Sequence, residues 1–198
     1  MPFRSRSQAA SSVSGAGSVL HIFGGFSEKV DGWALDTQQA VEVTGHSFLQ
    51  PLGGKKNSFS SRLASAVTLL SGDYILTGGR ESGRDVQLLS GTKKQTWTKL
   101  SSMLSSRYAH ASSPIYLHDE EYVIVAGGYD NLHKPQVTVE IYNVYENIWT
   151  LLENLPTPRV HFSLQVIFIC IRDGSPALSL EYVQSRGVFA GHTNAQNQ

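Results

Sequence analysis

The chain has 198 residues, of which 40% are hydrophobic and 16% charged, and it contains 18 glycines. This composition excludes an extensively disordered chain and favours an ordered, loop-rich β protein with a hydrophobic core. The formal net charge is zero, so there is no general electrostatic attraction to nucleic acid or to an anionic membrane, and neither partner is expected.

The first segment, residues 1–17, is rich in Ser, Ala and Gly and carries Arg4 and Arg6 without any acidic residue. It lacks the apolar stretch of a secretory signal. A transit peptide has a similar composition, but the simpler interpretation is a disordered leader.

Three apolar, strand-like runs along the chain end in a glycine pair. The runs are LHIFGG, YILTGG and VIVAGG, and the pairs are Gly24 and Gly25, Gly78 and Gly79, and Gly127 and Gly128. They recur at intervals of about 50 residues, the length of a repeat that contains several short strands. Glycine at such a strand end predicts a positive φ angle or a bulge, and the close approach of another backbone.

A second sequence pattern repeats at about the same interval as the glycine pairs. The segments WTKLSSMLSSR, from Trp97 to Arg107, and WTLLENLPTPR, from Trp149 to Arg159, share residues at equivalent positions. Strand-like segments precede them, VQLL and TVEIY, and the second contains Tyr142. Each unit therefore holds several short strands.

These features together resemble the kelch motif, and residues 127–159 match it best. The resemblance covers roughly residues 18–170 and implies an all-β fold of four-stranded antiparallel sheets, each one blade of a β-propeller. The units are then 18–62, 63–107 and 108–159, with a partial fourth from residue 160; they form a propeller segment 18–171, which a divergent tail, 172–198, follows. Trp97, Tyr142 and Trp149 are expected to fill the space between blades.

The blade count predicts an incomplete kelch-type propeller. First strands are predicted at residues 64–70, 110–117 and 161–171, but none within residues 1–18. About three blades result, in an open arc, whereas propellers typically have four to eight. Three interpretations stay open: a part or shortened isoform of a longer product, a chain that pairs with a second copy or another kelch chain, and a persistent open arc.

Residue types that would support catalysis or metal binding do not form a recognisable pattern. The seven histidines lack the helical spacing of a zinc site, and no serine stands in a G-x-S-x-G motif. We therefore predict no catalytic residue, no metal and no cofactor. Because some propellers of this family are enzymes, a carbohydrate- or small-molecule-active propeller enzyme is the alternative.

The only cysteine, Cys170, lies in the apolar run VIFICI and excludes an intramolecular disulfide. A reducing, cytoplasmic location is therefore expected.

Loops that follow the glycine pairs are the predicted binding elements, because propellers present their connections around the hub. Their candidate residues are aromatic, basic or polar: Trp33, Arg80, Arg84, Tyr129, Asp130, Asn131 and His133. The resemblance also implies a ligand-binding role at the channel mouth for Arg107 and Arg159. Hydrogen bonds that tie one blade to the next would explain these two arginines equally well.

The function expected from the resemblance is non-catalytic protein–protein interaction with a partner of unknown identity. Kelch proteins act as substrate receptors of ubiquitin ligases or as cytoskeletal scaffolds, although nothing in this chain resembles a BTB or F-box module. A truncated isoform without independent function is a further alternative.

Overall fold

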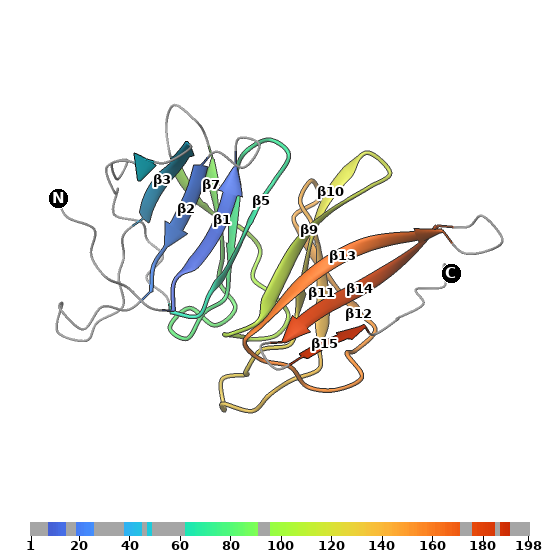
Figure 1. Ribbon diagram of the computed structural model, residues 1–198. Helices are drawn as coiled ribbons and strands as arrows, with labels where there is room; N and C mark the ends of the chain where they lie inside the picture. The colour runs from blue at the N-terminus through green and yellow to red at the C-terminus, as the bar shows by residue number, and fades with distance from the viewer. Residues whose placement is uncertain are drawn as a thin grey trace.

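A computed structural model of the chain describes residues 8–14, 19–25, 38–44, 47–48, 62–90, 96–170, 176–184 and 187–190. In these ranges every regular element is a β-strand, and all strand pairs are antiparallel. The strands form three four-stranded sheets and one three-stranded sheet, which Figure 1 shows arranged one after another. The predicted all-β fold with about three four-stranded blades is confirmed.

Each four-stranded sheet is a meander of consecutive strands. Blade I contains β1 (Ala10–Ser14), β2 (Val19–Phe23), β3 (Gln38–Thr44) and β4 (Ser47–Phe48). Blade II contains β5 (Ser65–Thr68), β6 (Tyr74–Thr77), β7 (Val86–Ser90) and β8 (Thr96–Lys99). Blade III contains β9 (Ala111–Leu117), β10 (Glu120–Ala126), β11 (Val139–Asn143) and β12 (Ile148–Leu152). The fourth sheet contains β13 (Phe162–Cys170), β14 (Pro176–Gln184) and β15 (Gly187–Ala190).

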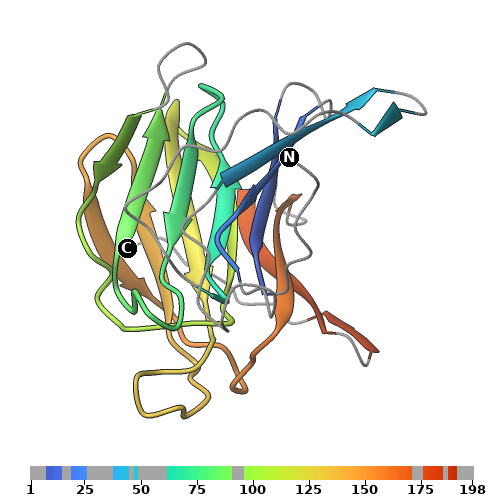
Figure 2. The ribbon, with the colours of Figure 1, turned by 90° about the vertical axis from the view of Figure 1, so that its left-hand side faces the viewer.

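The first strands of the four sheets lie side by side and form the hub. Strand β1 contacts β5, β5 contacts β9, and β9 contacts β13, while later strands extend outward (Figures 1 and 2). Hydroxyl groups join neighbouring hub strands: Ser12 Oγ lies 2.6 Å from Thr68 Oγ1, and Ser65 Oγ lies 2.5 Å from Ser112 Oγ. This radial arrangement is that of a propeller.

Strand β1 corrects the prediction of a disordered leader over residues 1–17. Residues 10–14 pair with β2 along their whole length and complete blade I. The segment ASSVS is made mostly of small residues, and strand propensity favours β-branched and aromatic ones, so the pattern gave no strand signal. Small side chains suit this position, because Ala10 is buried and Ser12 contacts β5.

The region expected as a divergent tail also contributes to a sheet. Strand β14 pairs with β13 from Gln184 to Pro176, and β15 pairs with β14. Parts of residues 172–198 thus continue the antiparallel pattern of the preceding blades.

The hydrophobic core is divided into three clusters between neighbouring sheets. Between blades I and II, the buried residues are Ala10, Phe23, Tyr74, Leu76 and Leu89. Between blades II and III, they are Val67, Leu69, Ile75, Val86, Met103, Val123, Val125, Tyr142 and Trp149. Between blade III and β13, they are Ala111, Ile115, Ile124, Ala126, Val139, Leu155 and Leu164. Burial of this apolar surface holds adjacent sheets together.

The glycine pair of blade III shows why the sequence places glycine at this strand end. Gly127 and Gly128 have φ angles of +59° and +90°. A Cβ atom on Gly127 would lie 2.5 Å from the carbonyl oxygen of Arg159, and one on Gly128 would lie 2.7 Å from that of Tyr108. The amide of Gly128 donates to the Arg159 carbonyl at 2.7 Å. A side chain on Gly127 would collide with the loop that leads into β13, and one on Gly128 with the loop that leads into β9.

Candidate functional site

The candidate site lies on the loop face, where second strands end at their glycine pairs and first strands begin. A series of backbone hydrogen bonds crosses this face from sheet to sheet. Leu63 N donates to Gln8 O at 2.9 Å, Ala109 N to Leu63 O at 2.8 Å, and His161 N to Ala109 O at 2.9 Å. All four residues have φ angles between 51° and 58°, the left-handed region. We call this series the hub seam, and it fixes the positions of the loops around it.

The residues that precede the hub seam pair with the residues that follow the glycine pairs. In blade III, Tyr129 N donates to Tyr108 O at 2.8 Å and Tyr108 N to Tyr129 O at 3.1 Å. In blade II, the equivalent bond runs from Arg80 N to Arg62 O at 2.8 Å. Neighbouring blades thus present a tyrosine pair and an arginine pair at corresponding positions.

Four rings from three loops gather beside the seam and form what we call the mouth cluster: Tyr108, Tyr129, His133 and His161. The two tyrosine rings stack with centroids 5.1 Å apart. His133 packs edge-on against Tyr108, and the Tyr108 hydroxyl lies 2.8 Å from His133 Nδ1. His161 meets Tyr129 at 6.1 Å. The tyrosines are half-buried and both histidines are exposed, so the cluster offers ring surface and ring nitrogens to a partner.

The loop that carries Tyr129 and His133 is held in shape by Asp130. Its Oδ1 accepts hydrogen bonds from the backbone amides of Leu132 and Lys134, both at 2.8 Å. Backbone bonds join Asp130 N to Lys134 O and His133 N to Asp130 O. Asp130 therefore positions the loop, whereas its neighbour Asn131 is exposed and free to reach a partner.

The basic side of the site is formed by loop residues of blade II. Arg62 Nε donates to Glu81 Oε1 at 2.6 Å, and Glu81 Oε2 accepts from Arg62 N. Arg80 is exposed and forms no ion pair with the residues that the structure describes. Arg84 is exposed too, but its Nε donates to Met103 O at 2.6 Å, which ties it to the loop between blades II and III.

The Arg107 side chain is buried and does not lie at the channel mouth, which corrects its expected position among the binding candidates. Its side chain is fully buried and forms an ion pair with Glu140, with Nη2 2.5 Å from Oε1. Nη1 donates to the carbonyls of Gly127 and Thr138, and the Arg107 carbonyl accepts from Gly79 N. The residue joins blade II to blade III, the structural role that the sequence left open.

The other predicted residues fall in different places. Arg159 is half-buried and offers its carbonyl to Gly128, while Trp33 lies outside the described residues. Tyr142 and Trp149 belong to the cluster between blades II and III, with ring centroids 4.8 Å apart. Trp97 is half-buried and packs edge-on against Phe23 of blade I.

Sequence reasoning missed Tyr108, Arg62 and Glu81. Tyr108 directly follows the repeated arginine, so its position in the repeat was a usable signal. Arg62 and Glu81 pair only through the fold, across two loops of blade II, and no spacing in the sequence predicts that contact.

Two further observations concern other kinds of site. In the described ranges, no three His, Cys, Asp or Glu side chains lie close enough to hold a metal ion together. The same ranges contain no helix with the length and hydrophobicity needed to cross a membrane.

Comparisons with known proteins agree with this architecture. A family model of the kelch motif matches residues 118–156, which begin at the β9–β10 turn and end beyond β12. Among solved structures, the kelch-type β-propeller YjhT superposes with a TM-score of 0.58 at 16% sequence identity. The match covers 77% of this chain and 47% of the YjhT chain, so the protein spans less than half of that structure. No curated protein matches the chain. The chain therefore contains a kelch motif and has the fold of a kelch-type β-propeller segment.

Proposed function

We propose that the protein is a non-catalytic protein-interaction module that binds its partner through the mouth cluster and Arg80. The observation that carries this proposal is the gathering of exposed ring and guanidinium groups on loops that the hub seam and Asp130 hold rigid. Tyrosine and arginine are the residue types that contribute most to protein interfaces. A rigid loop also loses little conformational freedom on binding.

The partner segment that fits this surface carries carboxylates beside an aromatic or apolar residue. Arg80 is an exposed cation on the loop of blade II and Lys134 one on the loop that carries Tyr129, and the tyrosine pair supplies a flat apolar surface. Arginine binds carboxylates through paired hydrogen bonds. A substrate-recognition or cytoskeletal scaffold role, and a cytoplasmic location, belong to the same proposal.

Site-specific photo-crosslinking tests the surface. A photoreactive amino acid at Asn131 is expected to capture a partner protein in cells, and the adduct should disappear when Arg80→Glu is added. The matched control carries the same amino acid at Thr150, which is exposed on the outer strand β12. Identical adducts from both positions would contradict the proposal. Turnover of a sugar that His133→Ala abolishes would instead establish the enzyme alternative.

Pairing with a second copy or with another kelch chain is a separate part of the proposal. Propellers generally close their ring, and a chain with about three blades gains a cover for its outer sheets by pairing. Light scattering on the purified chain is expected to give twice the mass of one chain, 21.7 kDa, if copies pair with each other. A monomeric mass at high concentration would rule that pairing out.

A further inference from the structure

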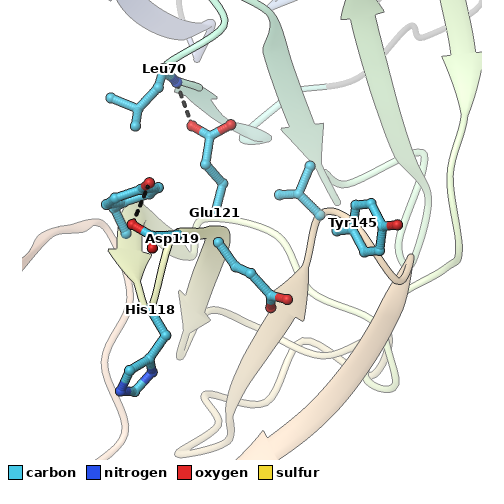
Figure 3. A pocket seen from close by; sticks show the side chains of 8 residues that line it. Leu70, His118, Asp119, Glu121 and Tyr145 are labelled. Carbon is cyan, nitrogen blue, oxygen red and sulfur yellow. Dashed lines mark hydrogen bonds between the residues drawn. The ribbon is translucent and has the colours of Figure 1, made fainter.

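A pocket lies on the face opposite the glycine pairs, between the hairpin turns of blades II and III (Figure 3). Its volume is about 800 Å³, within the size range of ligand pockets. Blade II contributes Leu70 from the β5–β6 turn. Blade III contributes the β9–β10 turn and the β11–β12 turn, with the lining residues Tyr116, His118, Asp119, Glu120, Glu121, Val144 and Tyr145.

The rim of the pocket exposes large apolar surface. The side chains of Leu70, Tyr116 and Tyr145 are 75%, 47% and 88% exposed. Hydrophobic groups from two turns and from the end of β9 that line one hollow form an interaction surface rather than scattered surface residues. Tyrosine also presents the ring face that attracts a cation.

The charge in the pocket has one sign. Asp119, Glu120 and Glu121 line it, and none of them forms an ion pair with a Lys or Arg in the described part of the chain. Their hydrogen bonds come from neutral donors: the Tyr116 hydroxyl to Asp119, the Tyr122 hydroxyl and the Asn143 amide to Glu120, and the Leu70 amide to Glu121. The carboxylates are therefore oriented by the fold, and no Lys or Arg among the described residues pairs with their charge.

The turns that carry these groups are fixed in geometry. His118 and Asp119 both have positive φ angles, 48° and 64°, as in the tight two-residue turns that suit a β-hairpin. The Glu121 carboxylate bonds to the backbone of blade II, so the pocket spans two blades. In Figure 3, Asp119 and Tyr145 lie on opposite sides of Glu121.

We propose that this pocket binds an arginine side chain, flanked by apolar residues, from a partner protein. Charge complementarity selects a cation. A guanidinium can form paired hydrogen bonds with a carboxylate and stack on a tyrosine ring at the same time, which an ammonium group cannot do. The apolar neighbours of the arginine would cover Leu70 and Val144. This surface is separate from the loop face and does not depend on the function proposed for it.

Titration calorimetry with short peptides tests this proposal. The probe is acetyl-Ala-Leu-Arg-Leu-Ala-amide, and the comparison peptides carry Lys or Glu in place of Arg. The Arg peptide is expected to bind, the Lys peptide to bind about threefold more weakly, and the Glu peptide not to bind. Raising the salt concentration from about 20 mM to about 300 mM should weaken binding of the Arg peptide, because salt screens the charge of carboxylates near the surface.

Variants identify the site of binding. Glu121→Gln and Asp119→Asn each keep a hydrogen-bond acceptor but lose the negative charge. Each should lower the affinity for the Arg peptide about fivefold. Tyr145→Ala should weaken it similarly without affecting folding, because that side chain is almost fully exposed. Glu153→Gln, an exposed acid outside the pocket, is the matched control. Arg80→Glu, on the loop face, should leave peptide binding unchanged.

Two results would overturn the proposal. One is equal binding of the Arg and Glu peptides; the other is unchanged affinity in Tyr145→Ala and in both charge variants, with thermal unfolding showing that they are folded. A clear change in affinity for the Arg peptide in Arg80→Glu, in particular a gain from the added carboxylate, would equally assign the peptide to the loop face and remove this pocket from consideration.

Discussion

Arg107 connects three parts of the molecule. Its carbonyl accepts a hydrogen bond from the second glycine of the blade II pair, and its side chain donates to the strand end of blade III. Its partner Glu140 also accepts hydrogen bonds from Leu104 N and Ser105 N. Burial lowers the pKa of the Arg107 guanidinium, and the charge of Glu140 acts in the opposite direction. A buried charge of this kind is tolerated only while its counter-ion and hydrogen bonds are in place.

Removing one member of this pair should be strongly destabilising. Arg107→Ala is expected to lower the free energy of unfolding by about 3–5 kcal/mol, because it leaves the Glu140 carboxylate buried without a counter-ion. Arg84→Ala, the exposed control, should cost less than about 1 kcal/mol. Urea unfolding measures both. The double variant Arg107→Met with Glu140→Leu should recover part of the loss, and a further loss in the double variant would contradict this account.

Glycine positions in this fold differ in what surrounds them, and two of them make a matched pair. Gly127 and Gly72 both have positive φ angles, but a Cβ on Gly127 would meet the Arg159 carbonyl, whereas nothing lies within 4 Å of one on Gly72. We expect Gly72→Ala to lower the free energy of unfolding by about 1–2 kcal/mol, because of backbone strain alone. Gly127→Ala should cost several times as much or prevent folding. Thermal unfolding of the two variants separates the effect of backbone strain from that of steric crowding. Equal losses of stability would mean that crowding at Gly127 is unimportant.

At the scale of elements, two buried histidines lie between blades. His110 has its Nε2 2.8 Å from Thr77 Oγ1, and burial, together with the charge of Arg107, lowers its pKa well below the usual value. His21 packs on Tyr74 with ring centroids 4.3 Å apart, and burial lowers its pKa as well. Both are neutral in the folded protein at neutral pH, so acidification favours the unfolded chain, which can take up the protons.

Stability should therefore be complete above about pH 6.5, the pKa of unfolded histidine, and decline as the pH falls toward the lower folded pKa values. Each histidine contributes a slope of at most about 1.4 kcal/mol per pH unit. His110→Gln can keep a hydrogen bond to Thr77 but cannot titrate, so its denaturation midpoint should vary less between pH 7.5 and pH 5. The same slope in the variant and the parent would show that His110 does not carry the effect.

Element boundaries show where sequence reasoning works in this protein. The glycine pairs correctly marked the ends of β2, β6 and β10, because all of these glycines have positive φ angles. At the ends of β6 and β10, crowding also leaves no room for a side chain on Gly78, Gly127 or Gly128. The hub strands of blades II and III were also predicted, since the segments SAVT and ASSPIYL contain branched or aromatic residues. Strand β1 was missed because its residues are small rather than strand-forming. They suit the strand only because β1 packs against β5, and the sequence does not reveal that contact.

The candidate site was less predictable than the fold. The loop from Tyr129 to His133 was chosen for its residue types, and the structure places it at the mouth of the hub. For Arg107 the same reasoning failed, because the repeat pattern is the same for an arginine that faces solvent and for one that pairs with a buried carboxylate. The carboxylate that decides the matter, Glu140, lies on another strand.

At the scale of the whole molecule, the main contacts between described strands of different sheets join neighbours: β1 with β5, β5 with β9, and β9 with β13. Blades II and III each have a hydrophobic cluster on both sides: blade II shares one with blade I and one with blade III, and blade III shares its second with β13. Stability in such an arrangement is approximately a sum of the stabilities of the units and of the interfaces between them. Blade III, like blade II, should therefore resist local opening more than blade I does.

Hydrogen exchange measures this difference. Amides in β10 and β11 of blade III are expected to exchange at least about tenfold more slowly than those in β2 and β3 of blade I. The exposed amide of Asn131 serves as a fast-exchanging reference within the same chain. Uniform exchange across the sheets would indicate one cooperative unit instead.

The hub seam has a direction. Every amide in it belongs to the later sheet and every carbonyl to the earlier one, from Gln8 through Leu63 and Ala109 to His161. A sheet added beside Gln8 has to supply a carbonyl, and one added beside His161 has to supply an amide. Any chain that extends this series must therefore join head-to-tail, since two copies meeting head-to-head would set donor against donor or acceptor against acceptor.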